Sequence, residues 1–221
     1  MHAPKDFPRS GTTILMIKSS LSPSGLSTME FYDTHAKEYC ESTVHLDLRG
    51  VYERFLGELG PGARILDAGC GSGRDTKAFL DKDYCVTAID ASPEVARLAR
   101  TFTGQPCGVL RFQDMEFREE FDGIWACASL LHVPKDEMPD VLPRFIQALK
   151  PAGILYLSLK EGDGERIAAD GRFFSNYSTS SFRGLLVTFP VLREVAFWKT
   201  EEIRSPGQRQ PWLNFLLKKV K

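Results

Sequence analysis

Apolar and polar residues follow one another along this chain in a pattern that predicts alternating strands and helices. Strands are expected from Ile65, at 84–92, at 109–112, in a fourth run that ends near Ala128, and at 154–159, 192–203 and 212–220. Helices are expected at 74–80, after Ser92, and at 139–149 and 181–189. Strands that alternate with helices in this way predict an α/β fold built on a mostly parallel sheet.

The segment before the first strand divides into two parts. Residues 1–28 are rich in Ser, Pro and Gly and predict a flexible N-terminal arm, whose apolar stretch at 14–17 is too short for a signal peptide or a membrane span. Met29 is a candidate for the natural start. Two helices are expected after it, the second with apolar residues at helical spacing from Val44 to Leu59. We therefore expect one domain over 29–221, with a helical cap at 29–60 and the sheet core at 61–221.

The most informative stretch joins the first strand to the helix at 74–80. It contains Gly69, Gly71 and Gly73, and glycine lets a backbone turn sharply and approach a ligand closely. The helix that follows points unpaired N–H groups and the positive end of its dipole toward the loop. This arrangement favours a nucleotide-type cofactor, although glycine loops of this kind also serve as plain turns.

Asp90 strengthens the cofactor interpretation. It ends the second strand, 17 positions after Gly73 along the sequence. In open parallel sheets, a carboxylate about 20 residues after the glycine loop binds the ribose hydroxyls. A helix-capping role is less expected for Asp90, because Ser92 supplies an N-cap and Pro93 a first helical residue.

Two residues argue against a nicotinamide dinucleotide. The dinucleotide fingerprint has a small residue where this chain has Arg74. Asp67, two residues before Gly69, would repel a pyrophosphate but suits an amine or hydroxyl groups.

Several motifs together resemble the class I S-adenosylmethionine (SAM) dependent methyltransferases. The resemblance covers roughly 29–221, looks closest to small bacterial members such as the tellurite-resistance type, and rests on the runs LDAGCGSG, AIDAS, RFQDMEF, FDGIWACASLLHVP and LKPAGILYLSLK. It implies a Rossmann-like, doubly wound, seven-stranded sheet with an antiparallel C-terminal hairpin. Many relatives have a second glycine where this chain has Ala152, which leaves the geometry of that turn open.

The resemblance also implies which residues bind SAM. Asp67, Gly69 and Gly71 would surround its amino acid part, and Arg74 would reach its carboxylate. Asp90 would hold the ribose, and Asp114 would read the adenine amino group. The full set of expected cofactor-binding residues is Asp67, Gly69, Cys70, Gly71, Gly73, Arg74, Asp90, Ala91, Asp114, Met115, Ala128 and Ser129.

Catalytic groups are less defined by the sequence. His132 follows the fourth strand and is a candidate general base, with loop packing as its alternative role. Tyr39 is a candidate lid residue, and Tyr32 is either part of a substrate pocket or of an aromatic core. The loop at 160–179 suits a substrate-covering flap and equally an ordinary surface loop.

Composition limits the choice of partners. Of the 221 residues, 43% are apolar, which is enough for the core of one domain. The net charge of −1 does not indicate electrostatic attraction to a nucleic acid backbone. Five cysteines without a CxxC pair or metal-like spacing predict reduced thiols, a cytoplasmic location and no metal site.

The sequence therefore predicts a SAM-dependent methyltransferase that transfers methyl in line to a small-molecule acceptor. The expected protein does not act on nucleic acid or membranes and is a monomer or homodimer. One alternative is a non-catalytic SAM-binding interaction protein. A nicotinamide-dependent oxidoreductase is a further alternative, which Arg74 and Asp67 disfavour.

Overall fold

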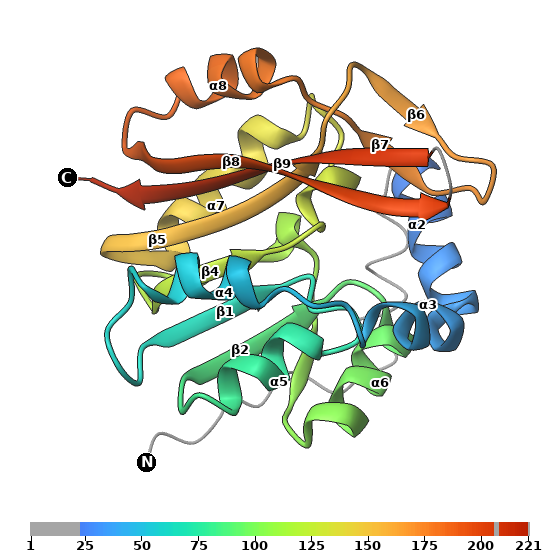
Figure 1. Cartoon of the computed structure of the whole chain (residues 1–221), viewed down its shortest axis with the longest axis horizontal. Coiled ribbons are helices and arrows are strands. Elements are labelled where there is room, and N and C mark those ends of the chain that lie inside the picture. Colours follow the sequence, from blue (N-terminus) through green and yellow to red (C-terminus); the bar gives the residue numbers. More distant parts are fainter. Residues whose placement is uncertain (1–22, 206–207, 221) are drawn as a thin grey trace.

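The computed structural model describes residues 23–205 and 208–220 and contains a seven-stranded sheet with helices on both faces (Figure 1). Its strand order is β3-β2-β1-β4-β5-β9-β8. The strands from β3 to β5 run parallel, and β9 pairs antiparallel with both β5 and β8. The expected Rossmann-like α/β fold with an antiparallel C-terminal hairpin is confirmed.

The elements have the following bounds. The strands are β1 (Arg64–Ala68), β2 (Cys85–Asp90), β3 (Cys107–Val109), β4 (Phe121–Ala126), β5 (Leu149–Lys160), β6 (Glu165–Ile167), β7 (Phe173–Ser175), β8 (Leu192–Ser205) and β9 (Gln208–Lys219). The helices are α2 (Pro23–Thr34), α3 (Ala36–Thr43), α4 (Arg49–Leu56), α5 (Arg74–Leu80), α6 (Pro93–Thr103), α7 (Met138–Ala148) and α8 (Thr179–Val187). Short 3₁₀ turns occupy Phe112–Asp114 and Leu130–His132.

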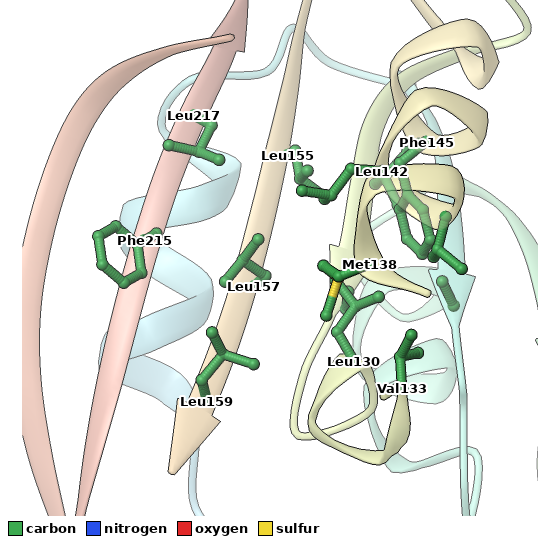
Figure 2. Packing of buried hydrophobic residues seen from close by; sticks show 14 of the residues in the cluster. Leu130, Val133, Met138, Leu142, Phe145, Leu155, Leu157, Leu159, Phe215 and Leu217 are labelled. Carbon is green, nitrogen blue, oxygen red and sulfur yellow. The ribbon is translucent and has the colours of Figure 1, made fainter. Parts of the chain in front are cut away.

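Apolar side chains of α7 and α8 cover one face of the sheet. Figure 2 shows Leu155 and Leu157 of β5 facing Leu142 and Phe145 of α7, and all four are fully buried. On the other face, Phe55 of α4 and Phe79 of α5 pack around Trp125, Tyr156 and neighbouring strand residues. This burial on both faces explains why the strands are almost continuously apolar.

Strand β9 is buried at the centre of its length, as its apolar sequence predicts. Leu213, Phe215 and Leu217 point into the core beneath α7 and α8, while Leu216 packs on the opposite face with Tyr156. The hairpin therefore completes both hydrophobic layers and belongs to the core.

Three expected boundaries are corrected by the structure. The third strand ends at Val109 instead of Phe112, because residues 111–114 close into a turn in which the N–H of Asp114 donates to the carbonyl of Arg111. The second helix begins at Arg49 instead of Val44, since the Asp47 carboxylate accepts the Arg49 N–H and turns the chain there. The fifth strand starts at Leu149, earlier than the expected 154.

The N-terminal arm expected over 1–28 falls mostly outside the described residues. Its last part is helical, because α2 begins at Pro23. The Ser27 hydroxyl donates to the carbonyl of Gly171, and the Thr28 hydroxyl accepts the N–H of Phe173. These contacts attach α2 to the hairpin β6–β7, so the packed structure begins before Met29.

Candidate cofactor and acceptor site

The glycine loop connects β1 to α5 at the carboxyl edge of the sheet. Gly69 has a φ of 79° and Gly71 a φ of 54°, both in the region that favours glycine. A Cβ on Gly69 would lie 2.5 Å from the Cβ of Ser129, and one on Gly71 would lie 3.1 Å from the Tyr39 hydroxyl. Glycine is therefore required both by backbone conformation and by the closeness of the opposing residues.

Asp90 lies at the end of β2 with its carboxylate over this loop. One carboxylate oxygen accepts the N–H of Gly71 at 3.0 Å, and the other accepts the N–H of Ser92 at 2.9 Å. Burial raises the pKa of Asp90 to about 6, although the two N–H donors act in the opposite direction. The Ser92 side chain accepts the N–H of Val95, which confirms Ser92 as the N-cap of α6.

Two cavities meet at this edge of the sheet, where the strand order reverses between β1 and β4. The first cavity lies between Asp90 and the turn after β3. Its wall combines two carboxylates and one guanidinium with apolar, hydroxyl and amide groups. It includes Thr28, Met29, Tyr32, Tyr39, Gly69, Asp90, Ala91, Ser92, Leu110, Arg111, Phe112, Gln113, Ala128, Ser129, His132, Val133, Pro134 and Glu137.

The second cavity adjoins the first and is larger, at about 590 Å³, a size suited to small organic molecules. On one side it is lined by the glycine loop from Gly69 to Ser72. On the other side it is lined by residues from the ends of β5 and β9 and from the β6–β7 hairpin, among them Lys160, Arg172, Phe174, Trp212 and Asn214. Lys160, Arg172 and Phe174 belong to the loop at 160–179, which the sequence offered as a substrate-covering flap or an ordinary surface loop. Trp212 and Asn214 were expected only as residues of the last strand.

Tyr32 and His132 lie where the two cavities meet, and each lines both of them. His132 Nδ1 lies 2.7 Å from the carbonyl of Phe173, which only accepts, so Nδ1 carries the proton. His132 Nε2 therefore accepts the hydroxyl of Tyr32 at 2.8 Å. Burial lowers the pKa of His132 to about 4, aided by the positive charges of Arg172 and Lys160. The imidazole is neutral at pH 7.

Tyr39 covers the glycine loop from α3. Its ring meets that of Tyr32 edge to face at 4.8 Å between centroids, and it lines both cavities. Burial holds the pKa of Tyr39 well above its usual range, so its hydroxyl stays protonated. Tyr39 therefore lies against the glycine loop and forms part of the wall of both cavities.

Arg74 lines the second cavity but is already engaged. Its guanidinium donates to both carboxylate oxygens of Asp75, at 2.6 and 2.9 Å, and to the carbonyl of Thr43. Asp75 also accepts from the Tyr52 hydroxyl and the Trp125 indole N–H. Asp75 thus joins the start of α5 to the core, a role that no sequence pattern indicated.

Asp67 lines neither cavity. It is 1% exposed, and its carboxylate accepts the hydroxyl of Thr76 at 2.5 Å behind the glycine loop. Burial and the nearby charge of Asp75 raise the pKa of Asp67 to about 8. Asp67 is thus buried next to Thr76 of α5 and outside both cavities, and its expected contact with the cofactor stays a prediction.

Three more residues expected to bind the cofactor do not line either cavity. Asp114 forms a bidentate ion pair with Arg111, at 2.6 and 2.9 Å, and Arg111 lines the first cavity. Met115 is 1% exposed and packs in the main core. Gly73 caps α5 and packs against Thr103, where a Cβ would come within 2.7 Å of the Thr103 methyl group.

The remaining expected residues line the cavities. Ala91 lines the first, Cys70 the second, Ser129 the first and Ala128 both. Ala128 has a φ of 52°, and its N–H donates to the Ser158 hydroxyl. The Cys70 sulfur lies 3.3 Å from that of Cys107, and all five cysteines are free.

Comparison with known proteins identifies the class. Residues 65–153 match a family model described as a methyltransferase domain. The structure resembles a Burkholderia thailandensis 1,6-didemethyltoxoflavin-N1-methyltransferase solved with its substrate and S-adenosylhomocysteine. The TM-score is 0.72 at 23% identity, over 99% of this chain and 95% of the other. This stretch therefore matches a methyltransferase domain, and the chain has the fold of SAM-dependent methyltransferases, whose cofactor is SAM.

The sequence relatives are also methyltransferases, and they differ in how much of this chain they match. A ubiquinone biosynthesis O-methyltransferase of Xanthomonas campestris is 34% identical over 105 residues, 44% of this chain and 43% of the relative. An uncharacterized methyltransferase of Staphylococcus carnosus is 27% identical over 71% of this chain and 78% of its own length. The chain thus spans less than half the length of the first curated relatives it matches.

Within 23–205 and 208–220, no group of three or more His, Cys, Asp or Glu side chains is placed to hold a metal ion. None of the helices described is long and apolar enough to cross a membrane.

Proposed function

We propose that the protein transfers the methyl group of SAM to a small-molecule nucleophile. The observation that carries the proposal is the pair of adjoining cavities. The first lies beside the glycine loop and the Asp90 carboxylate, and the second is large enough for an acceptor. The Burkholderia thailandensis neighbour, solved with bound 1,6-didemethyltoxoflavin, supports a small-molecule acceptor.

The residues present fit SAM. Asp90 would accept hydrogen bonds from the ribose hydroxyls, and Leu110–Gln113 would enclose the adenine in place of the side chains of Asp114 and Met115. The cradle from Gly69 to Ser72 would hold the amino acid part, because a Cβ at Gly69 or Gly71 would fill that space. Tyr39 would close over it.

Methyl transfer from SAM requires few catalytic groups from the protein. When bound, SAM supplies a methyl group on a positively charged sulfur: the nucleophile–carbon bond forms as the sulfur–carbon bond breaks, and the electron pair stays on sulfur. The chain's task is to align the nucleophile and exclude water, which contributes about 7–11 kcal/mol in well-oriented systems. A base is needed only for a nucleophile that arrives protonated.

His132 and Tyr32 would receive that proton. Because Nδ1–H donates to the carbonyl of Phe173, Nε2 is the accepting atom of His132. The Tyr32 hydroxyl donates a hydrogen bond to this Nε2. A proton from the acceptor would pass to His132 Nε2, either directly or through the Tyr32 hydroxyl. We expect His132→Ala to leave affinity for S-adenosylhomocysteine nearly unchanged while slowing turnover by about 10²–10⁴-fold. Equal turnover would return His132 to a packing role.

The alternative of a non-catalytic SAM-binding module predicts no usable acceptor space, whereas the second cavity has a volume of about 590 Å³. The deciding experiment incubates the protein with methyl-labelled SAM and an acceptor set that includes phenols, heteroaromatic amines, thiols and tellurite. We expect S-adenosylhomocysteine to form with a labelled small molecule. Methylation of tellurite alone would favour the tellurite-resistance type, and cofactor binding without any turnover would favour the non-catalytic module.

We also propose that the protein works in a reducing, cytoplasmic environment as a monomer or homodimer. The five free thiols support such an environment, since two of them face each other without forming a bond. Light scattering of the purified full chain tests the oligomeric state.

A further inference from the structure

One turn of α2 contacts both nitrogens of the His132 ring, one directly and one through the backbone of β7. The Tyr32 hydroxyl is hydrogen-bonded to His132 Nε2 at 2.8 Å. His132 Nδ1 lies 2.7 Å from the carbonyl oxygen of Phe173, and the Thr28 hydroxyl accepts the N–H of Phe173 at 2.9 Å. Thr28 and Tyr32 are four residues apart in α2, so they lie on the same side of that helix. Together these contacts form a closed ring that starts and ends on α2.

The backbone of Phe173 connects Thr28 to His132. Its N–H donates to the side chain of Thr28, and its carbonyl accepts from the ring of His132. In an extended strand the N–H and the carbonyl of one residue point to the same edge, so a movement of β7 that displaces one also displaces the other. Thr28 is 7% exposed and Phe173 is 8% exposed, which leaves little room for water to replace the hydroxyl. The Thr28 hydroxyl therefore helps to fix the position of the carbonyl that meets His132.

That carbonyl decides which nitrogen of His132 carries the proton. A carbonyl only accepts hydrogen bonds, so it selects the tautomer with hydrogen on Nδ1. The Tyr32 hydroxyl can donate or accept, so its contact with Nε2 is compatible with either tautomer. Only the tautomer with hydrogen on Nδ1 leaves the lone pair of Nε2 able to take a proton. The state of the candidate base thus depends on whatever holds the Phe173 carbonyl in place.

A neighbouring contact attaches the same two elements without taking part in this path. The Ser27 hydroxyl donates to the carbonyl of Gly171, two residues before Phe173. This contact also joins α2 to the β6–β7 hairpin, but it involves neither the backbone of Phe173 nor the ring of His132. Ser27 therefore provides a matched comparison for Thr28.

From this geometry we infer that Thr28 is a positioning residue for methyl transfer, which keeps the proton of neutral His132 on Nδ1 through the backbone of Phe173. The inference rests on the proposed methyltransferase function, with His132 as its base, and deepens it by assigning how that base is prepared. The proton of the acceptor goes to Nε2, and the ring then carries hydrogen on both nitrogens while Nδ1–H stays on the carbonyl. Thr28 also lines the first cavity, so the test must separate an effect on cofactor binding from an effect on His132.

The test is ¹⁵N NMR of the full-length protein labelled at histidine, recorded at pH 7. Protonated and unprotonated ring nitrogens have different chemical shifts, and His132→Gln identifies the signals of His132 among those of the four histidines. We expect hydrogen on Nδ1 alone in the wild-type protein. Thr28→Val keeps the shape of the side chain but removes the acceptor of the Phe173 N–H. The tautomer with hydrogen on Nε2, undetected in the wild type, should then appear, as it should in Thr28→Ala.

Two controls limit the interpretation. Thr28→Ser retains the hydroxyl and should give the wild-type spectrum, and Ser27→Ala should give it as well. Calorimetry with S-adenosylhomocysteine shows whether each variant is folded, and its affinity should be unchanged in Thr28→Val. With an acceptor found by methyl-transfer assay, Thr28→Val should lower kcat by about tenfold, part of the effect of a general base, and leave KM for SAM unchanged.

Several results would overturn the inference. These are hydrogen on Nε2 in the wild type, a wild-type spectrum in folded Thr28→Val and Thr28→Ala, the same change in Ser27→Ala as in Thr28→Val, or an altered tautomer with unchanged kcat. Failure of the wild-type protein to bind S-adenosylhomocysteine would instead overturn the proposed function on which the inference rests.

Discussion

Replacing Asp90 by asparagine tests the ribose assignment with almost no change in shape. A carboxylate has about four acceptor positions. The N–H groups of Gly71 and Ser92 take two of them, which leaves two for the two ribose hydroxyls. Asparagine loses the charge and turns an N–H₂ group toward one of the two backbone donors. We expect affinity for SAM to fall by about 1–3 kcal/mol, or roughly 5–150-fold.

The same residue predicts a pH dependence. In the free protein the pKa of Asp90 is about 6, and hydroxyl donors of the ribose favour the ionised carboxylate. Affinity should therefore be constant above pH 7 and fall by about tenfold per pH unit well below pH 6. Asp90→Asn should remove this dependence.

Calorimetric titration with S-adenosylhomocysteine between pH 5 and 8 measures both effects. Asp81→Asn is a control for the loss of one carboxylate, because Asp81 is exposed at the end of α5 and forms an i,i+4 ion pair with Lys77. A folded Asp90→Asn protein with wild-type affinity, or a wild-type affinity independent of pH down to 5, would refute the ribose assignment.

Three predictions concern stability, each measured by thermal or urea unfolding. Gly69→Ala should destabilise the fold by about 1–3 kcal/mol, since its Cβ would overlap Ser129; an unchanged midpoint would contradict the close approach. Ala152→Gly should stabilise it by about 1 kcal/mol, because Ala152 has a φ of 63°, and a loss of stability would contradict this reason. Asp75→Leu should cost about 3–5 kcal/mol by leaving the Arg74 charge unpaired, whereas a neutral effect would show that the ion pair is dispensable.

Local sequence signals predicted the parts of the site that lie within one strand–loop–helix unit. Helix α5 has the expected bounds, Ser92 caps α6 as expected, and the glycine loop and Asp90 lie together at the carboxyl edge. These features depend on neighbouring residues, because a left-handed glycine or an N-cap is set by its own short stretch of chain.

The acceptor side could not be predicted in the same way. Lys160, Arg172 and Trp212 come from three separate elements, and only the pairing of β5 with β9 and the contacts of the β6–β7 hairpin bring them together. Asp114 matched a family position, yet the ion pair with Arg111 holds its side chain outside the cavity. Side-chain pairing of this kind overrides the expectation taken from a motif.

The most direct test of the account is a calorimetric titration of the purified full-length protein with SAM, S-adenosylhomocysteine and NADH. We expect both adenosyl compounds to bind with micromolar affinity and NADH not to bind. Binding of NADH alone, or of none of the three, would contradict the assignment of the glycine loop and Asp90 to a SAM site.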